Sequence, residues 1–320
     1  MTQPSVSVYI LTCNQQRYIK QCVESALAQA SDISLEILVG DDCSNDDTSQ
    51  ILEEMATTYP EEITHIRHPH RLGPMMNCQV LLRQAKGELL AHLDGDDYWL
   101  PGKLKLQLAY MAANPGCAAV YTNAITVRED GSTIGLFNNE GNGRYDLAAM
   151  LRRGNFLNTS SMVFRSELKA ALLEIKEPFI DYRIHLRHAR TGFLTQLKQP
   201  LVGYRVNSIG AMTSTTASND MVRKLYWEAI LDVPRNLVTD NDLAHGVTDF
   251  LRRVISRALR TRRWELIREW VPQVYETSPY GITRTSLLVM GSVIRATFLV
   301  ILGKLQTAPD GYRVNIRHRR

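Results

Sequence analysis

The 320-residue sequence lacks a disulfide or metal-binding cysteine pattern and the motifs of several enzyme classes. Its five cysteines form no CxxC pair and no even framework, so we expect reduced thiols in a reducing compartment. No signal-peptide pattern occurs at its start, which favours a cytoplasmic location. Neither the dinucleotide fingerprint GxGxxG nor the phosphate-binding GxxxxGK[ST] loop is present. HExxH and GxSxG are also missing, which argues against zincins and α/β-hydrolases.

Composition is ordinary, but charge is unevenly distributed. With 44% hydrophobic and 22% charged residues, the chain is unlike disordered, collagenous or coiled-coil proteins. The net charge of +4 conceals a division: residues 221–320 hold 17 Lys and Arg against 9 Asp and Glu, whereas residues 1–220 hold 20 against 24. We therefore expect a slightly acidic domain over 1–220 and a basic region over 221–320.

In the first 125 residues, short apolar runs alternate with segments of helical periodicity. Four strands are predicted, at Val6–Leu11, Leu35–Val39, Thr64–Arg67 and Glu88–Leu93. Helices are predicted between them, from Tyr18, from Asp47 and over Asn77–Ala85. This alternation indicates an α/β fold whose parallel sheet has helices on both faces. In such sheets, ligands bind at the carboxyl ends of the strands.

The pattern becomes mixed after Cys117. Further strands are expected at Ala118–Val127, Ser161–Phe164 and Leu201–Val206, and a helix at Tyr182–Ala189. Two polar stretches, Glu129–Arg144 and Asn207–Asp220, are predicted as loops, and the rest as largely helical. The domain from 1 to 220 thus divides into halves, 1–115 and 116–220.

Acidic residues follow two of the predicted strands. Asp94, Asp96 and Asp97 come directly after an apolar run, and three carboxylates so close together repel one another unless a cation neutralises them. Mg²⁺ or Mn²⁺ suits such ligands and also binds diphosphate. The alternative is an acidic turn that caps the helix after Pro101. Asp42 follows the second strand, where it could contact a nucleotide or simply cap the next helix.

Histidines offer a weaker indication of a metal site. Five of them fall in two groups, His65, His68 and His70, and His185 and His188. No matching cysteine or aspartate cluster lies near them in sequence, so we expect a solvated loop and a helix face instead.

Several ordered segments together are more specific than any single motif. They are Ser7–Asn14, Asp41–Thr48, Lys86–Glu88, Leu93–Trp99, Ser160–Arg165, Asp181–Tyr182 and Tyr204–Val206. With these segments, residues 5–215 resemble the inverting nucleotide-sugar glycosyltransferases of family 2. The resemblance implies the GT-A fold, a Rossmann-like and mostly parallel sheet flanked by helices, with the nucleotide-sugar bound by 1–115 and the acceptor by 116–220.

The resemblance also implies roles for individual residues. Asp42 would accept a hydrogen bond from uracil N3–H, and the donor-binding site would include Thr12, Cys13, Gly73 and Asn77. Asp96, helped by Asp94, would hold the divalent metal that bridges to the diphosphate. Asp181 would be the general base, which inversion by a single displacement requires. Without the resemblance, the favoured interpretation of Asp181 is the N-cap of the following helix.

The basic third contains an apolar segment, Leu287–Leu302, with Arg295 near its middle. Sixteen residues fall short of the roughly 20 that span a bilayer. Together with seven arginines in Leu251–Trp270, this segment indicates peripheral contact of 251–320 with anionic lipid. The alternative is a helical hairpin that packs on the catalytic domain. Nucleic acid is not expected as a partner, because few aromatic residues lie among the arginines.

Together these features predict transfer from a nucleoside-diphosphate sugar, expected to be a UDP-sugar, to a hydroxyl acceptor. From the family alone, the acceptor would be a polysaccharide or a lipid-linked oligosaccharide at the inner membrane face. Two alternatives stay open from the sequence. One is a nucleotidyltransferase acting on a sugar phosphate, and the other is a non-catalytic module that binds nucleotide or sugar.

Overall fold

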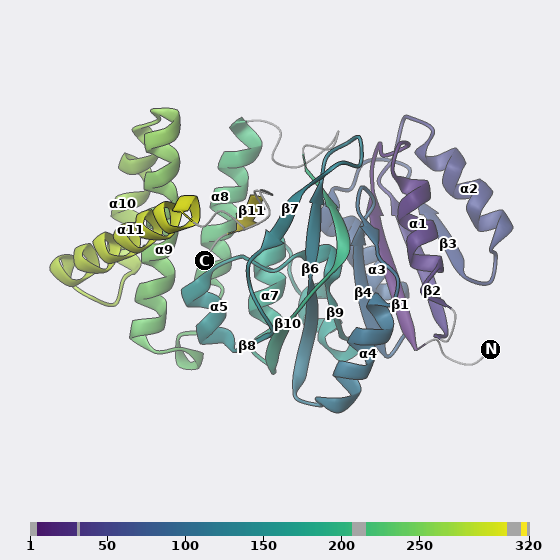
Figure 1. Cartoon of the computed structure of the whole chain (residues 1–320), viewed down its shortest axis with the longest axis horizontal. Helices are drawn as coiled ribbons and strands as arrows, with labels where there is room; N and C mark the ends of the chain where they lie inside the picture. Colours follow the sequence, from purple (N-terminus) through teal and green to yellow (C-terminus); the bar gives the residue numbers. More distant parts are fainter. Residues whose placement is uncertain (1–4, 31–32, 207–215, 306–314, 319–320) are drawn as a thin grey trace.

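A computed structural model describes residues 5–30, 33–206, 216–305 and 315–318 of the chain. Within these residues, eleven strands form one sheet, whose main path has the order β11-β7-β6-β9-β4-β1-β2-β3. The first half contributes four parallel strands, β1 (Val6–Thr12), β2 (Leu35–Asp41), β3 (Ile63–Arg67) and β4 (Leu89–Asp94). Figure 1 shows them at one end of the sheet, beside α1 and α2.

The second half makes the sheet mixed. Its long strands β6 (Cys117–Val127) and β10 (Phe193–Arg205) pair in parallel, whereas β9 (Val163–Arg165) runs antiparallel to β4 and β6. Shorter strands complete it: β5 (Tyr98–Trp99), β7 (Thr133–Asn138), β8 (Gly143–Tyr145) and β11 (Asn315–His318). A mixed, mostly parallel sheet flanked by helices, with a helical C-terminal region, confirms the predicted fold class.

Both faces of the sheet are buried. Along β1, Tyr9 belongs to one apolar cluster and its neighbours Val8 and Ile10 to another, because successive side chains of a strand point to opposite faces. The cluster with Val8 also contains buried side chains of α1 (Ile19–Leu27), α2 (Thr48–Thr58) and α4 (Lys103–Ala113). The cluster with Tyr9 contains those of α3 (Pro74–Gln84), α5 (Leu147–Arg153), α6 (Lys169–Leu173) and α7 (Asp181–His188).

A glycine allows α3 to lie close to the sheet. A Cβ atom at Gly40 would stand 1.9 Å from Asn77 Oδ1. Asn77 is buried, donates from Nδ2 to the Gly40 carbonyl (2.8 Å), and lies with Oδ1 2.9 Å from His68 Nε2. These contacts fix the start of α3 behind the carboxyl end of β2.

Two loop predictions need correction. Glu129–Arg144 holds β7 and most of β8. Leu136 pairs with Ile125 of β6 and Phe137 is buried in an apolar cluster, although glycine and asparagine surround them. In the predicted loop Asn207–Asp220, residues 207–215 lie outside the described part of the chain, and α8 already begins at Thr216.

In the described part of the C-terminal region there are four α-helices, α8 (Thr216–Leu231), α9 (Asp240–Thr261), α10 (Glu265–Thr277) and α11 (Ile282–Leu305). Trp227, Phe250 and Trp270, from the first three, belong to the same apolar cluster as α5 and α7. Tyr226 of α8 stacks on Tyr182 of α7 with ring centroids 4.4 Å apart. In Figure 1 these helices lie at the end of the molecule opposite to α2 and β3. Among the described residues, no helix has the length and apolar character to cross a membrane.

Candidate active site

The carboxyl ends of β1, β2 and β4 meet at one edge of the sheet. Thr12 is in register with Asp41 on β2, and Leu11 with Asp94 on β4. Just past the strand ends, Asp42 donates its backbone N–H to the Thr12 carbonyl (2.9 Å) and Gly95 donates to the Leu11 carbonyl (2.9 Å). The two acidic segments predicted from sequence therefore lie on either side of the end of β1.

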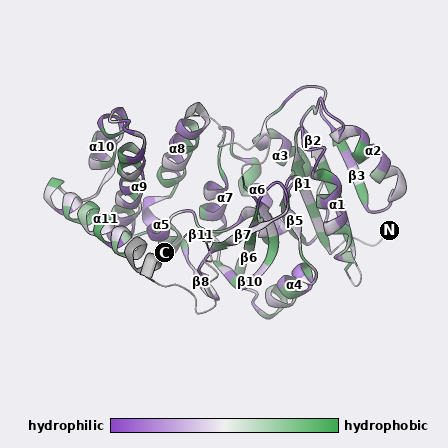
Figure 2. Cartoon of the chain, turned by 45° about the horizontal axis from the view of Figure 1, so that its top comes forward, coloured by the Kyte–Doolittle hydropathy of each residue, from purple (hydrophilic) through white to green (hydrophobic). Residues whose placement is uncertain are grey.

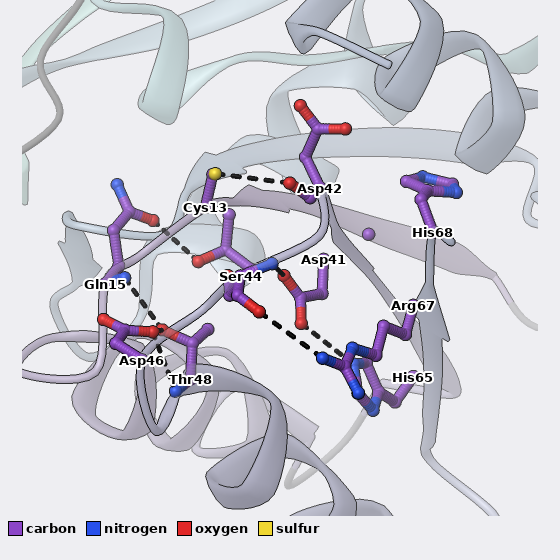
Figure 3. A network of polar contacts seen from close by, with 12 residues as sticks. Cys13, Gln15, Asp41, Asp42, Ser44, Asp46, Thr48, His65, Arg67 and His68 are labelled. Carbon is purple, nitrogen blue, oxygen red and sulfur yellow. Dashed lines mark hydrogen bonds and ion pairs between the residues drawn. The ribbon is translucent and has the colours of Figure 1, made fainter. Parts of the chain in front are cut away.

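Asp42 holds the loop that leads into α3. Its two carboxylate oxygens accept the backbone N–H groups of Leu72 (2.6 Å) and Gly73 (2.9 Å). It does not cap the next helix, because α2 begins at Thr48 with Asp47 as its N-cap, so the capping alternative is wrong for this residue. In Figure 3 the Asp42 carboxylate points away from that of its neighbour Asp41.

Asp41 is a buried support for this edge of the sheet, and no role was predicted for it from the sequence. It is buried, and its Oδ1 accepts the Ser44 N–H (2.9 Å) while Oδ2 lies 3.8 Å from His65 Nε2. Burial opposes its ionisation, but His65 and Ser44 outweigh that effect and lower the pKa of Asp41. A charged Asp41 thus fixes the turn after β2, whose Ser44 hydroxyl accepts the Asn14 N–H (2.9 Å).

The first loop brings two predicted donor-binding residues beside Asp42. Cys13 Sγ donates to the Asp42 carbonyl (3.3 Å), and Thr12 Oγ1 donates to Gln15 Oε1 (2.8 Å), as Figure 3 shows for Cys13 and Gln15. Partial burial raises the pKa of the Cys13 thiol. Thr12, Cys13, Asp42 and Gly73 therefore form one hydrogen-bonded group, and Asn77 lies behind it in the core.

Ser160 connects the acidic residues after β4. Its Oγ lies 2.6 Å from Asp97 Oδ2 and 3.1 Å from Asp94 Oδ2, and His92 Nε2 lies 3.0 Å from Asp94 Oδ1. Burial, with the charges of Asp96 and Asp94, raises the pKa of Asp97 well above its usual range. Burial also opposes ionisation of Asp94, but His92 and Ser160 lower its pKa.

Ser160 Oγ thus links the two carboxyl groups, and its single hydrogen can be donated to only one of them at a time. Asp97 Oδ1 accepts the Arg205 N–H (2.8 Å) at the end of β10. The cluster does not cap α4, whose N-cap is Gly102, so the acidic-turn alternative is wrong.

Asp181 is the first residue of α7 and is partly exposed. Asn155 Nδ2 donates to its Oδ1 (2.8 Å), and Thr159 Oγ1 donates to its Oδ2 (2.9 Å). Oδ1 also accepts the N–H of Tyr182 (2.8 Å), although Ile180 occupies the N-cap position. Burial raises the pKa of Asp181, and the negative charge of Asp94 adds to this, while the three hydrogen bonds oppose it.

A single turn of 3₁₀-helix, Thr159–Ser161, joins the two acidic groups. Thr159 contacts Asp181 and its neighbour Ser160 contacts Asp94 and Asp97. Trp99 Nε1 donates to the Ser160 carbonyl (2.7 Å), which anchors the turn to β5. The sequence marked Ser160 only as part of a family-like segment and gave Thr159 no role, because these contacts join residues 22 and 66 positions apart.

The donor set suits a hard divalent cation. Asp94 and Asp96 are partly exposed beside the buried Asp97, and Mg²⁺ or Mn²⁺ commonly takes one or two carboxylates and completes its shell with substrate phosphate. No group of three or more His, Cys, Asp or Glu side chains in the described residues could hold a metal by itself. The histidines are dispersed: His65 is near Asp41, His68 near Asn77, and His185 is 2.8 Å from Tyr121 Oη.

Comparison with known proteins assigns the chain to a class of enzyme. Glycosyl transferase family 2 matches residues 7–168, just over half of the chain. The chain belongs to this family. The match contains both acidic strand ends and the Thr159–Ser161 turn, and it ends before Asp181.

In sequence, individual relatives match only part of the chain. A protein of Mycobacterium tuberculosis with no assigned function is 32% identical over 190 residues, which cover 58% of this chain and 54% of that protein. The GalNAc(5)-diNAcBac-PP-undecaprenol β-1,3-glucosyltransferase of Campylobacter jejuni is 30% identical over 175 residues, or 54% of each chain. The matched part thus spans about half the length of these relatives. The structure of S. aureus TarS 1–349 with UDP-GlcNAc superposes with a TM-score of 0.66 at 20% identity, covering 96% of this chain and 95% of that one, and shows the same fold.

Proposed function

We propose that the protein is an inverting, metal-dependent glycosyltransferase that moves a sugar from a UDP-sugar to a hydroxyl acceptor. The observation that carries this proposal is the Thr159–Ser161 turn. It holds a carboxylate suited to proton removal, Asp181, in a fixed relation to carboxylates suited to a metal–diphosphate complex. Family membership supports sugar transfer as the reaction, and the UDP-GlcNAc bound to TarS supports UDP as the nucleotide.

The donor would bind at the edge formed by β1 and β2. Thr12, Cys13 and Gly73 surround Asp42, whose carboxylate oxygens each accept one backbone N–H. Each oxygen has a second lone pair, so Asp42 can still accept the N3–H of uracil. Asn77 would act indirectly, by holding the start of α3 against Gly40.

The diphosphate would lie at the end of β4. Asp96 and Asp94 would hold a divalent cation there, which stabilises the negative charge that the departing nucleoside diphosphate gains. Asp97 is buried behind them and contacts Ser160 Oγ and the Arg205 N–H, so Asp94 and Asp96 are the partly exposed pair at this position.

Asp181 would remove the proton from the acceptor hydroxyl as its oxygen attacks the anomeric carbon. The bond from that carbon to the diphosphate breaks on the opposite side, so the configuration inverts and the proton stays on Asp181. Asn155 and Thr159 fix the direction of the carboxylate. The raised pKa of Asp181 makes it a stronger base than an ordinary aspartate.

The acceptor would be a growing polysaccharide or a lipid-linked oligosaccharide on the cytoplasmic side. The Campylobacter relative, whose name specifies an undecaprenol-linked saccharide, supports this class of acceptor. The second half of the catalytic domain, residues 116–220, would bind the acceptor, because Asp181 lies in that half.

Two substitutions test the division of roles. Asp181→Asn should reduce kcat about 10²–10⁴-fold and leave UDP binding nearly intact, as expected for a lost general base. Asp96→Asn should abolish transfer and also weaken metal-dependent UDP binding. Asp130→Asn, in an exposed turn, is the matched control and should leave both unchanged. Full turnover by Asp181→Asn would overturn the base assignment, and release of pyrophosphate in place of UDP would indicate a nucleotidyltransferase.

A further inference from the structure

Helix α11 buries Thr285 and Ser292 and packs Val289 against the core, yet it exposes several large apolar side chains. Thr285 and Ser292 face the rest of the protein and are 0% and 8% exposed. Leu287, Ile294 and Phe298 face away and are 58%, 66% and 58% exposed, and Met290 is similarly exposed. A surface helix of a globular protein ordinarily has the reverse arrangement, with its apolar stripe toward the core.

The exposed apolar residues form a continuous row. Leu287, Met290, Ile294 and Phe298 follow one another at spacings of three and four, which places them along one side of the helix. We call these four residues the apolar stripe. Figure 2 shows hydrophobic residues recurring along α11 at the margin of the molecule. Isolated exposed leucines are common, but a continuous apolar row marks a surface that another body covers.

Polar contacts at the start of α11 fix its rotation. Thr285 Oγ1 donates to the Tyr280 carbonyl (3.0 Å) and lies 2.8 Å from Ser278 Oγ. Ser286 Oγ lies 2.7 Å from Tyr275 Oη of α10. Turning the helix to bury the apolar stripe would break these contacts. The outward direction of the stripe is therefore part of the fold.

Positive charge accompanies the stripe. Arg284 and Arg295 are exposed, and at 100° per residue they lie about 60–80° from Leu287 on the same side. Residues 282–320 hold seven Lys and Arg against one acidic residue, Asp310. Arginines beside an apolar row can place their stems along a lipid surface and their charges among anionic headgroups.

We propose that the apolar stripe, with Arg284 and Arg295, docks on the surface of a bilayer that contains anionic phospholipid. The helix would lie in the plane of the interface, with the stripe among the acyl chains. Packing connects it to the acceptor half, since α11 contacts α9, α9 contacts α5, and α5 contacts α7, which begins with Asp181. Docking would thus hold that half of the protein at the membrane. This inference does not depend on the reaction proposed above.

Vesicle flotation tests the proposal. The full chain should float with phosphatidylcholine vesicles that contain phosphatidylglycerol, and more weakly with phosphatidylcholine alone. Ile294→Gln with Phe298→Gln should lower the partition coefficient at least tenfold. Arg284→Gln with Arg295→Gln should remove the preference for phosphatidylglycerol. The matched control is Leu231→Gln with Leu237→Gln, two exposed leucines that lie outside α11, which should bind like the wild type.

Two further measurements make the result decisive. Ile294→Leu with Phe298→Leu keeps the stripe apolar and should retain binding, and unchanged melting temperatures show that every variant is folded. Failure of the wild type to float, or equal flotation of the Ile294→Gln and Phe298→Gln variant, would overturn the proposal. So would a lipid-free dimer that this variant dissociates in sedimentation velocity, because the stripe would then be a contact between copies.

Discussion

Thr159 and Ser160 are adjacent in one 3₁₀ turn, yet their hydroxyl groups contact different acidic centres. Thr159 holds Asp181, and Ser160 lies between Asp94 and Asp97. A displacement of this turn would move the proposed base relative to the proposed metal–diphosphate site. Near-ideal alignment of two reactants can lower an activation barrier by about 7–11 kcal/mol, so a rigid connection between the two centres would favour the proposed transfer.

Replacing Thr159 should affect proton removal and leave donor binding unchanged. Thr159→Val removes a hydrogen bond that favours ionised Asp181, and its loss should raise the pKa of Asp181 further. The acidic limb of the kcat profile should therefore move to higher pH, and kcat should fall about tenfold. Thr159→Ser keeps the hydroxyl and should behave like the wild type. An unchanged acidic limb in Thr159→Val would show that this contact does not tune the base.

Replacing Ser160 should have the complementary effect. Ser160→Ala removes the hydroxyl that contacts both Asp94 and Asp97, so each carboxyl group would lose a partner that fixes its position. UDP affinity in the presence of Mn²⁺ should fall about tenfold or more in calorimetry, as expected for a lost hydrogen bond to a charged group. Ser132→Ala, on an exposed turn, is the control. Equal affinity in Ser160→Ala and wild type would contradict the role given to this hydroxyl.

The sequence predicts the acidic residues at the edge of the sheet well, but it does not predict the side-chain contacts that connect them to the rest of the site. Apolar runs followed by Asp42 and Asp94 are local signals, and both strand ends lie where the periodicity places them. The Thr159–Ser161 turn has no such signal, because its importance comes from side chains far along the chain. Asp181 shows a similar limit: a carboxylate that begins a helix has the same local sequence whether or not it acts as a base.

The sequence did not predict the strands β7 and β8 or the orientation of α11, and the reason is a different one. Glycines and asparagines in Glu129–Arg144 indicate a loop locally, and pairing with β6 and β10 overrides that preference. In α11, the apolar residues of Leu287–Leu302 predict a helix but not the side that faces outward. Hydrogen bonds of Thr285 and Ser286 decide that direction.

Gly40→Ala should destabilise the fold. The new Cβ would stand 1.9 Å from Asn77 Oδ1, and Asn77 is buried with partners on both sides. Overpacking of this kind costs about 1–3 kcal/mol, measurable as a lower midpoint in urea unfolding. Gly141→Ala is the control, because a Cβ at Gly141 meets nothing within 4 Å. Identical midpoints for Gly40→Ala and wild type would show that α3 can move away from β2.

Asp232 should stabilise the contact between α7 and the end of α8. Arg183 (2.9 Å), Arg187 (3.0 Å) and Arg190 (2.5 Å) all contact its carboxylate. Burial opposes ionisation, but these arginines lower the pKa of Asp232. Asp232→Ala leaves three partly buried cations without this partner and should cost about 3–5 kcal/mol at neutral pH.

The pH dependence follows from the direction of that shift. A carboxylate with a depressed folded-state pKa stabilises the protein above its unfolded-state pKa and loses this contribution as pH falls. The difference in unfolding free energy between wild type and Asp232→Ala should therefore shrink in acid. Urea unfolding between pH 7 and pH 3 measures it, with Asp130→Ala as the control. A difference that grows as pH falls would contradict the account.

Calorimetric titration of UDP, with and without Mn²⁺, tests the central claim most directly, using the wild type, Asp96→Asn and Asp181→Asn. We predict that Mn²⁺ strengthens UDP binding to the wild type and to Asp181→Asn, and that this gain is lost in Asp96→Asn. Absence of UDP binding to the wild type with or without Mn²⁺ would contradict the assignment of a UDP-sugar donor, and a metal effect that survives in Asp96→Asn would contradict the metal site.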